Sequence, residues 1–144
     1  MKINRHGSAA WEGGIKDGKG AISTESGALK SYPYGFASRF EGQPGTNPEE
    51  LIAAAHAGCF TMALTASLGR AGFVPKRLAT QAVVSLEQVD GKWTINHVQL
   101  TTEAWIPGID VTHFQKIAAD AKADCPVSRL FKADISLSAK LEPS

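Results

Sequence analysis

Two cysteines are the residues of this 144-residue chain with the clearest chemical potential. Cys59 lies within a long uncharged stretch, and Cys125, the only other cysteine, comes directly before Pro126. A thiol becomes a strong nucleophile when it is ionised, and a helix N-terminus or a nearby cation lowers its pKa toward neutrality. We expect Cys125 to cap a short helix that starts at Pro126, and Cys59 to be buried and to need a cation. In a reducing compartment, two distant thiols are more often free, catalytic or redox-sensing than a permanent disulfide.

The candidate cation for Cys59 is Arg39, whose guanidinium Glu49 can hold in a bidentate ion pair. Each of these residues also has an ordinary interpretation, as a small core cysteine, a solvated arginine or a surface glutamate at a helix N-terminus. His56 offers a rival chemistry, because residues three apart on a helix share a face and His with Cys forms a nucleophile pair. The residues alone therefore leave three functions open: a redox enzyme, a cysteine hydrolase that uses Cys59 and His56, and a non-enzymatic small-molecule binding protein with inert cysteines.

Composition argues against several other classes of protein. The formal net charge is +1 with scattered Lys and Arg, which gives no electrostatic footprint for nucleic acid or an anionic membrane. The four histidines and two cysteines lack the paired spacing of a zinc site, so we expect no metal. The first residues do not resemble a secretory signal, and we expect a cytoplasmic protein. Small and polar residues interrupt the uncharged stretch 51–69, which favours a buried helix over a membrane span.

The first half of the chain predicts a β-meander followed by a long helix, within one domain spanning residues 1–144. Turn signals at 12–14, 17–20 and 25–27 separate short strands, and the alternation in 36–41 predicts a strand with Arg39 opposite its phenylalanines. The helix is expected over 48–70, with Asn47 as its cap and Glu50 bonding back to the Asn47 amide. This helix is apolar on nearly every face, so it must be covered all round.

The second half predicts a hairpin, two helices and a last strand. Segments 79–89 and 93–105 pair around an Asp90-Gly91 turn, with a bulge near Asn96 and His97. An amphipathic helix over 111–123, capped by Asp110 or Thr112, precedes the short helix that runs to about residue 132, and residues 135–141 alternate as a strand. The expected fold class is α+β, with an N-terminal antiparallel β-meander, a long buried central helix, a C-terminal hairpin, an amphipathic helix and a final strand.

Four segments closely resemble the OsmC/Ohr family when they are taken together. They are 39–42 (RFEG), 45–51 (GTNPEEL), 54–60 (AAHAGCF) and 123–128 (ADCPVS), and the likeness extends to the opening 11–13 and the turn at 19–20. The combination of a GTNPE segment, a cysteine ten residues after its glutamate and a late Cys-Pro is highly specific. His56 makes the chain similar to the osmotically inducible, OsmC-type branch.

The resemblance implies a thiol-dependent peroxidase that reduces organic hydroperoxides to alcohols in bacterial oxidative and osmotic stress. It gives Cys59 the peroxidatic role, through a sulfenic acid, and Cys125 the resolving role, through a Cys59–Cys125 disulfide. Arg39 and Glu49 become the activating pair. The resemblance also implies an intertwined homodimer, no metal, haem or flavin cofactor, and an external dithiol reductant of lipoyl or another type.

Two further expectations concern the substrate and the second chain. We expect Phe36, Phe60 and Met62 to provide apolar walls that suit a bulky alkyl hydroperoxide. Ten residues of helix separate Glu49 from Cys59 by about 15 Å along the axis, which is too far for one shared site. The simplest arrangement therefore places the Glu49 of a second chain beside each Cys59, with the two long helices antiparallel across a twofold axis.

Overall fold

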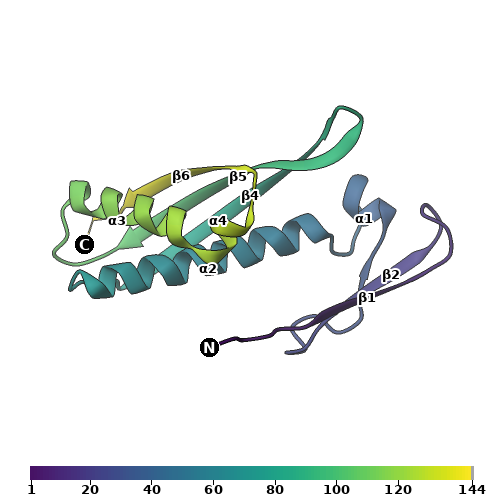
Figure 1. Ribbon diagram of the computed structural model, residues 1–144, viewed down its shortest axis with the longest axis horizontal. Coiled ribbons are helices and arrows are strands. Elements are labelled where there is room, and N and C mark those ends of the chain that lie inside the picture. Colours follow the sequence, from purple (N-terminus) through teal and green to yellow (C-terminus); the bar gives the residue numbers. More distant parts are fainter. Residues whose placement is uncertain (144) are drawn as a thin grey trace. The chain divides into compact units, whose positions relative to one another are not determined.

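The computed structural model describes residues 1–143, and the chain divides into two compact units, Met1–Leu51 and Ile52–Ser144. The first unit contains the predicted antiparallel meander, with strands β1 (Gly7–Glu12), β2 (Lys19–Thr24) and β3 (Tyr32–Tyr34) in that order (Figure 1). Side chains of the meander pack most closely at Gly20, because a Cβ added there would lie 2.4 Å from the Tyr34 ring and 2.6 Å from the Trp11 ring. The edge-to-face contact of those two rings, with centroids 5.6 Å apart, therefore requires glycine there.

The segment after β3 is a helix, α1 (Phe36–Phe40), and the strand expected over 36–41 was wrong. The Gly35 N–H donates to Ser38 Oγ at 2.9 Å, which stabilises the first turn. Phe36 and Phe40 alternate as a strand would, but they are also four residues apart and share a helix face, with ring centroids 5.0 Å apart. Arg39 lies with its guanidinium carbon 5.3 Å from the Phe40 ring centroid, so it does not point away from the phenylalanines.

The long helix α2 (Pro48–Arg70) has the predicted bounds and the predicted cap. Asn47 Oδ1 accepts the Glu50 N–H at 2.8 Å, whereas the Glu50 carboxylate accepts the Thr46 hydroxyl rather than the Asn47 amide. Every fourth side chain is buried: His56, Phe60, Leu64 and Leu68. The opposite face is exposed and consists largely of small residues: Ala54, Ala55, Gly58, Met62, Thr65, Ala66 and Gly69.

The sequence predicted that α2 is covered on all sides. Within residues 1–143, however, only one face of α2 is buried. Among residues 1–143, α2 is the one helix long and apolar enough to cross a membrane, a test that core helices of soluble proteins also pass. Its regular row of core side chains is the pattern of such a core helix.

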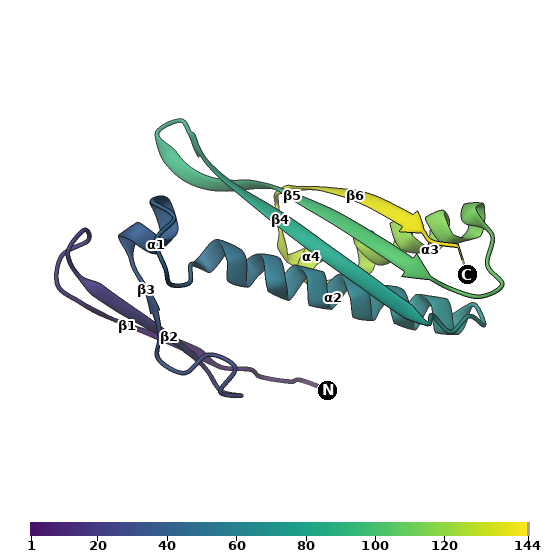
Figure 2. The ribbon, with the colours of Figure 1, turned by 180° about the vertical axis from the view of Figure 1, so that it is seen from behind.

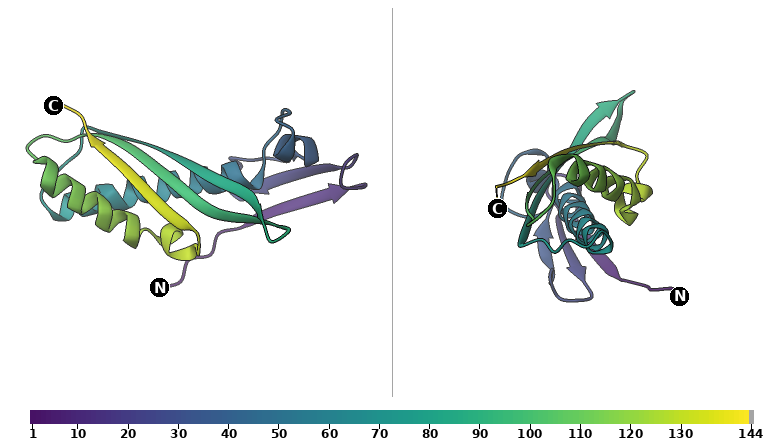
Figure 3. Two further views of the ribbon diagram at one scale, coloured as in Figure 1. Left: turned by 90° about the horizontal axis from the view of Figure 1, so that it is seen from above. Right: turned by 90° about the vertical axis from the view of Figure 1, so that its left-hand side faces the viewer.

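The second unit is a three-stranded sheet with helices on one face. Strand β4 (Arg77–Val89) pairs antiparallel with β5 (Lys92–Trp105), and β5 pairs parallel with β6 (Asp134–Leu141). Helices α2 and α3 (Val111–Asp124) lie side by side against this sheet (Figure 3). In the described part of this unit, no helix lies over the other face of the sheet (Figure 2). The core between the layers includes Phe60, Leu64, Leu68, Val98, Leu100, Phe114, Ile117 and Ala121.

Local signals in this unit are confirmed almost residue by residue. Asp90 and Gly91 have φ of 52° and 76°, as a tight hairpin turn of the mirror-image type requires. Ser85 pairs with His97 and Leu86 with Ile95, which leaves Asn96 as the bulged residue. The helix α3 is capped by Asp110, whose Oδ1 accepts the His113 N–H at 2.8 Å. The short helix α4 (Pro126–Leu130) ends two residues before the expected position.

The Asn47 cap provides a test of how α2 is started. Replacement Asn47→Ala removes the acceptor for the Glu50 N–H and is expected to lower the free energy of unfolding by about 1 kcal/mol. Asn47→Asp keeps a side-chain oxygen in place and should remain within about 0.5 kcal/mol of the parent. Urea unfolding at one fixed chain concentration measures both, and equal losses in the two variants would contradict the assigned cap.

Candidate active site

The structure brings together the two cysteines, which are 66 residues apart in sequence. Cys59 lies near the middle of α2, and Cys125 lies at the junction of α3 and α4. The Cys125 thiol donates to Cys59 Sγ at a sulfur–sulfur distance of 2.8 Å. No disulfide joins the two cysteines in this structure, and a shift of less than about 1 Å would bring the sulfurs to the 2.03–2.05 Å of a disulfide bond.

The burial expected for Cys59 is only partly reached, and the side-chain cap expected from Cys125 is not made. Cys125 is fully buried, whereas Cys59 is only partly buried. Cys125 does occupy the N-cap position of α4, but its side chain makes no capping hydrogen bond. Instead, the backbone N–H of Val127, in the first turn of α4, hydrogen-bonds to the sulfur of Cys59. The start of α4 therefore acts on Cys59, which belongs to α2, rather than on Cys125.

Electrostatics within the chain do not favour a thiolate at Cys59. Burial raises the pKa of Cys59, and its hydrogen bond with Cys125 raises that pKa further. The Val127 N–H lowers the pKa of Cys59 but does not offset burial. Because a raised pKa leaves less thiolate at neutral pH, Cys59 needs an additional positive charge to become an efficient nucleophile.

His56 is not arranged as a base for Cys59. Its ring is fully buried, its Nε2 is 2.8 Å from Ser128 Oγ, and its centroid lies 5.3 Å from the Phe131 ring in an edge-to-face contact. Burial lowers the pKa of His56, so the ring is neutral. Among residues 1–143, no hydrogen bond joins His56 to either sulfur. This geometry does not favour the cysteine hydrolase that the sequence left open.

Arg39 and Glu49 form the expected ion pair inside the first unit. Arg39 Nε donates to both Glu49 carboxylate oxygens, at 3.0 and 3.2 Å, and its terminal Nη2 donates to Oε1 at 2.5 Å. Glu49 is 9% exposed, so the pair is partly shielded from water. A planar fork held in this way presents the remaining guanidinium N–H groups in a fixed direction.

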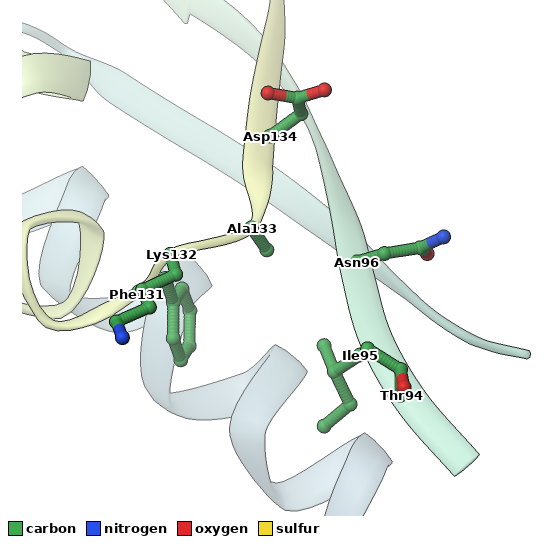
Figure 4. A pocket seen from close by; sticks show the side chains of 7 residues that line it. All are labelled: Thr94, Ile95, Asn96, Phe131, Lys132, Ala133 and Asp134. Carbon is green, nitrogen blue, oxygen red and sulfur yellow. The ribbon is translucent and has the colours of Figure 1, made fainter. Parts of the chain in front are cut away.

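The three residues expected to contact substrate lie in different environments. Phe60 is fully buried in the core, Met62 is 77% exposed on the small-residue face of α2, and Phe36 lies on α1 in the first unit. A pocket of about 320 Å³ opens in the second unit, between β5 and the segment that joins α4 to β6. Phe131 and Ile95 line its two sides (Figure 4). Through Phe131, this pocket adjoins the buried His56.

Sequence reasoning missed the contributions of Val127 and Ser128. Both belong to α4, whose start was recognised from Pro126, but the element against which this helix packs could not be known. The one available signal was spacing: Ser128 follows Cys125 by three residues, as Cys59 follows His56. Among residues 1–143, no three His, Cys, Asp or Glu side chains gather as a metal site would require.

An α+β fold with two adjacent thiols on a central helix and a helix start defines a dithiol redox protein. The sequence pattern of the OsmC-like protein family matches residues 40–140, and the chain belongs to this family. It is 54% identical over 142 residues to peroxiredoxin OsmC of Escherichia coli (strain K12), with 99% of each chain covered. These comparisons confirm the family expected from the sequence, and the structure confirms the expected α+β fold class.

Relatives named for hydroperoxide resistance are more distant. The organic hydroperoxide resistance protein of Xanthomonas axonopodis pv. citri (strain 306) is 31% identical over 101 residues, covering 69% of each chain. The crystal structure of the organic hydroperoxide resistance protein OhrB of Bacillus subtilis superposes with a TM-score of 0.71 at 26% identity. That superposition covers 95% of this chain and 98% of OhrB.

The sulfur geometry leads to a prediction that does not involve a peroxide. One equivalent of the thiol oxidant diamide should remove both thiols of each chain by forming a Cys59–Cys125 disulfide, because the sulfurs are already 2.8 Å apart. Thiol counting and intact mass measure the product, and a non-reducing gel should show no covalently linked dimer. A linked dimer, or loss of one thiol per chain, would contradict this geometry.

Proposed function

We propose that this chain is a thiol-dependent peroxidase that reduces organic hydroperoxides to alcohols in bacterial oxidative and osmotic stress defence. The single observation that carries the proposal is the 2.8 Å contact between Cys59 and Cys125 on two elements of the fold. Membership of the OsmC-like family and the peroxiredoxin name of the 54% identical relative support a peroxidase. Residues 1–144 are proposed to act as one domain.

The proposed cycle needs only the two thiols and an external reductant. The Cys59 thiolate attacks the distal oxygen of the hydroperoxide, the O–O bond breaks, and the alkoxide leaves as ROH after taking a proton. The resulting sulfenic acid condenses with the Cys125 thiol, which forms the disulfide and releases water. A dithiol of lipoyl or another type then exchanges with the disulfide and restores both thiols. No prosthetic group takes part in this cycle.

Cys59 is assigned the peroxidatic role because it is the more accessible thiol and receives the Val127 N–H. The fully buried Cys125 suits a resolving thiol, which meets a sulfenic acid rather than a bulky substrate. Phe36 and Met62 stay the proposed apolar contacts of the alkyl group, in an assembly of more than one chain, and the fully buried Phe60 is proposed to support this apolar wall from the core. We also propose that the enzyme works in the cytoplasm, where dithiol reductants are maintained.

The activating cation is proposed to be Arg39 of a second chain in a homodimer. Burial raises the pKa of Cys59, so the thiolate requires a positive charge that its own surroundings do not supply. Arg39 is held by Glu49, which precedes Cys59 by ten residues of continuous helix, or about 15 Å along the axis. Antiparallel packing of two α2 helices through their exposed small-residue faces would place the Arg39–Glu49 pair of one chain beside Cys59 of the other.

The two cysteines should behave differently when each is replaced by serine. Cys59→Ser should not react with cumene hydroperoxide, because the chemical step needs that sulfur. Cys125→Ser should react once, yield a dimedone adduct on Cys59 and over-oxidise under excess peroxide. Mass spectrometry after peptide digestion locates the adduct. A dimedone adduct on Cys125 of Cys59→Ser, with none on Cys59 of Cys125→Ser, would show that the roles are reversed.

The substitution Arg39→Lys tests whether a positive charge alone is sufficient to activate Cys59. A lysine ammonium lacks the planar fork that bonds Glu49 while facing the sulfur. Peroxide consumption should fall at least about tenfold, a rise of ~1.4 kcal/mol in the activation barrier. Arg5→Lys, on an exposed arginine in the first residues, is the matched control and should retain the parent rate. Parent activity in Arg39→Lys would show that another cation activates Cys59.

Mixed dimers test the proposed exchange between chains. Chains carrying Cys59→Ser retain Arg39, and chains carrying Arg39→Ala retain Cys59, so each homodimer alone should be inactive or strongly impaired. If Arg39 acts across the dimer, a mixed dimer has one complete site and should recover about half of the parent activity. Co-expression with two different tags isolates the mixed species. Recovery of no activity, or a fully active monomer in sedimentation, would contradict the proposed arrangement.

A further inference from the structure

The buried hydrogen bond between His56 and Ser128 has no part in the proposed chemistry, yet it joins the two elements that carry the thiols. His56 Nε2 and Ser128 Oγ are 2.8 Å apart, on α2 and α4 respectively. His56 is fully buried and Ser128 is 9% exposed. Among residues 1–143, the second ring nitrogen of His56, Nδ1, has no hydrogen-bond partner. Burying an imidazole in this state costs free energy, so an apolar side chain would be the more stable choice if packing were the sole requirement.

The helix α4 depends on outside contacts for its position. It has five residues, too few to be stable alone, and its N-cap residue makes no side-chain capping bond. Ser128 is the buried residue at its centre. Its hydroxyl bond to His56 is therefore a polar anchor that holds this short helix in one orientation on α2, and the Phe131 ring beside His56 holds the end of the same segment.

Two contacts between these elements follow the same helical spacing. Cys59 comes three residues after His56 on α2, and Ser128 comes three residues after Cys125 at the start of α4. Residues three apart lie on the same face of a helix. The His56–Ser128 bond therefore lies next to the Cys59–Cys125 sulfur contact and next to the Val127 N–H that reaches Cys59.

We propose that His56 and Ser128 are positioning residues for the resolving step, which hold Cys125 within bonding distance of the oxidised Cys59. The proposal rests on the proposed peroxidase function and concerns its second half. In that step the Cys125 thiolate attacks the sulfur of the Cys59 sulfenic acid, the S–S bond forms, and hydroxide leaves and becomes water with the thiol proton. Within residues 1–143, His56 and Ser128 are joined to each other and not by a hydrogen bond to either sulfur.

The experiment separates the two halves of the cycle in Ser128→Ala. Stopped-flow measurement of sulfenic acid formation gives the first step, and the appearance of disulfide after one equivalent of cumene hydroperoxide gives the second. Ser128→Ala should slow disulfide formation at least about tenfold, since small misplacement of reacting groups has large effects on rate. Sulfenic acid formation should change less than about threefold, so that dimedone traps Cys59 although Cys125 is intact. Ser128→Thr restores the hydroxyl and should restore the second step.

A matched control exists in the same unit. His97 Nε2 and Ser136 Oγ are also 2.8 Å apart, but they join β5 to β6 rather than the elements that carry the thiols. Ser136→Ala should leave both steps at the parent rate. If Ser136→Ala slows disulfide formation as strongly as Ser128→Ala, or if Ser128→Ala slows both steps equally, the role is general stability and the proposal is wrong.

A second measurement avoids peroxide altogether. In a glutathione redox buffer, the equilibrium between the dithiol and the disulfide reports the effective concentration of one thiol toward the other. Ser128→Ala should lower this effective concentration at least about tenfold. His56→Phe keeps a ring against Phe131 and should give the same loss, and the double variant should add little to either single change. An unchanged effective concentration in both single variants overturns the proposal, whereas failure of the parent to react with hydroperoxide overturns only the peroxidase function.

Discussion

The contact between the sulfurs of Cys59 and Cys125 is the interaction on which the site depends. These residues are 66 positions apart, and their 2.8 Å separation requires α2 and the α3–α4 junction to meet in one layer on the sheet. The row of buried side chains on α2 and the apolar face of α3 share one core. Packing of that core therefore also fixes the distance between the two sulfurs. The ability of the thiols to react with each other follows from ordinary helix packing.

The same packing creates an electrostatic problem that the site must solve. Burial raises the pKa of Cys59, and a neutral thiol is a weak nucleophile. The Val127 N–H supplies a partial positive charge but no net charge. The guanidinium of Arg39, held by the Glu49 carboxylate, is the cation that we propose for this role. The exposed row of small side chains on α2 would allow close approach of a second helix, so the proposed activation of the thiol depends on the proposed dimer.

Local sequence patterns predicted most of the helices and strands but not the tertiary contacts between them. The bounds of α2, the bulge at Asn96 and the Asp110 cap each depend on neighbouring residues and were correct. Phe36 to Phe40 was misread because its alternation fits both a strand and one turn of helix, and the Ser38 hydroxyl decided between them. The partial exposure of Cys59 and the missing side-chain cap from Cys125 were not foreseen, because both depend on which element packs over each sulfur. The Arg39–Glu49 ion pair could be predicted from the complementary chemistry of the two side chains. The contact of Ser128 with His56 could be recognised only in the tertiary structure.

The central claim is that hydroperoxide oxidises Cys59 and that Cys125 captures the product. The most direct measurement counts free thiols per chain with a colorimetric reagent, before and after one equivalent of cumene hydroperoxide under exclusion of air. The claim predicts loss of both thiols and formation of one equivalent of cumyl alcohol, with full recovery of the thiols after a dithiol is added. Unchanged thiols, whether with ester turnover as in a hydrolase or without any reaction, would contradict it.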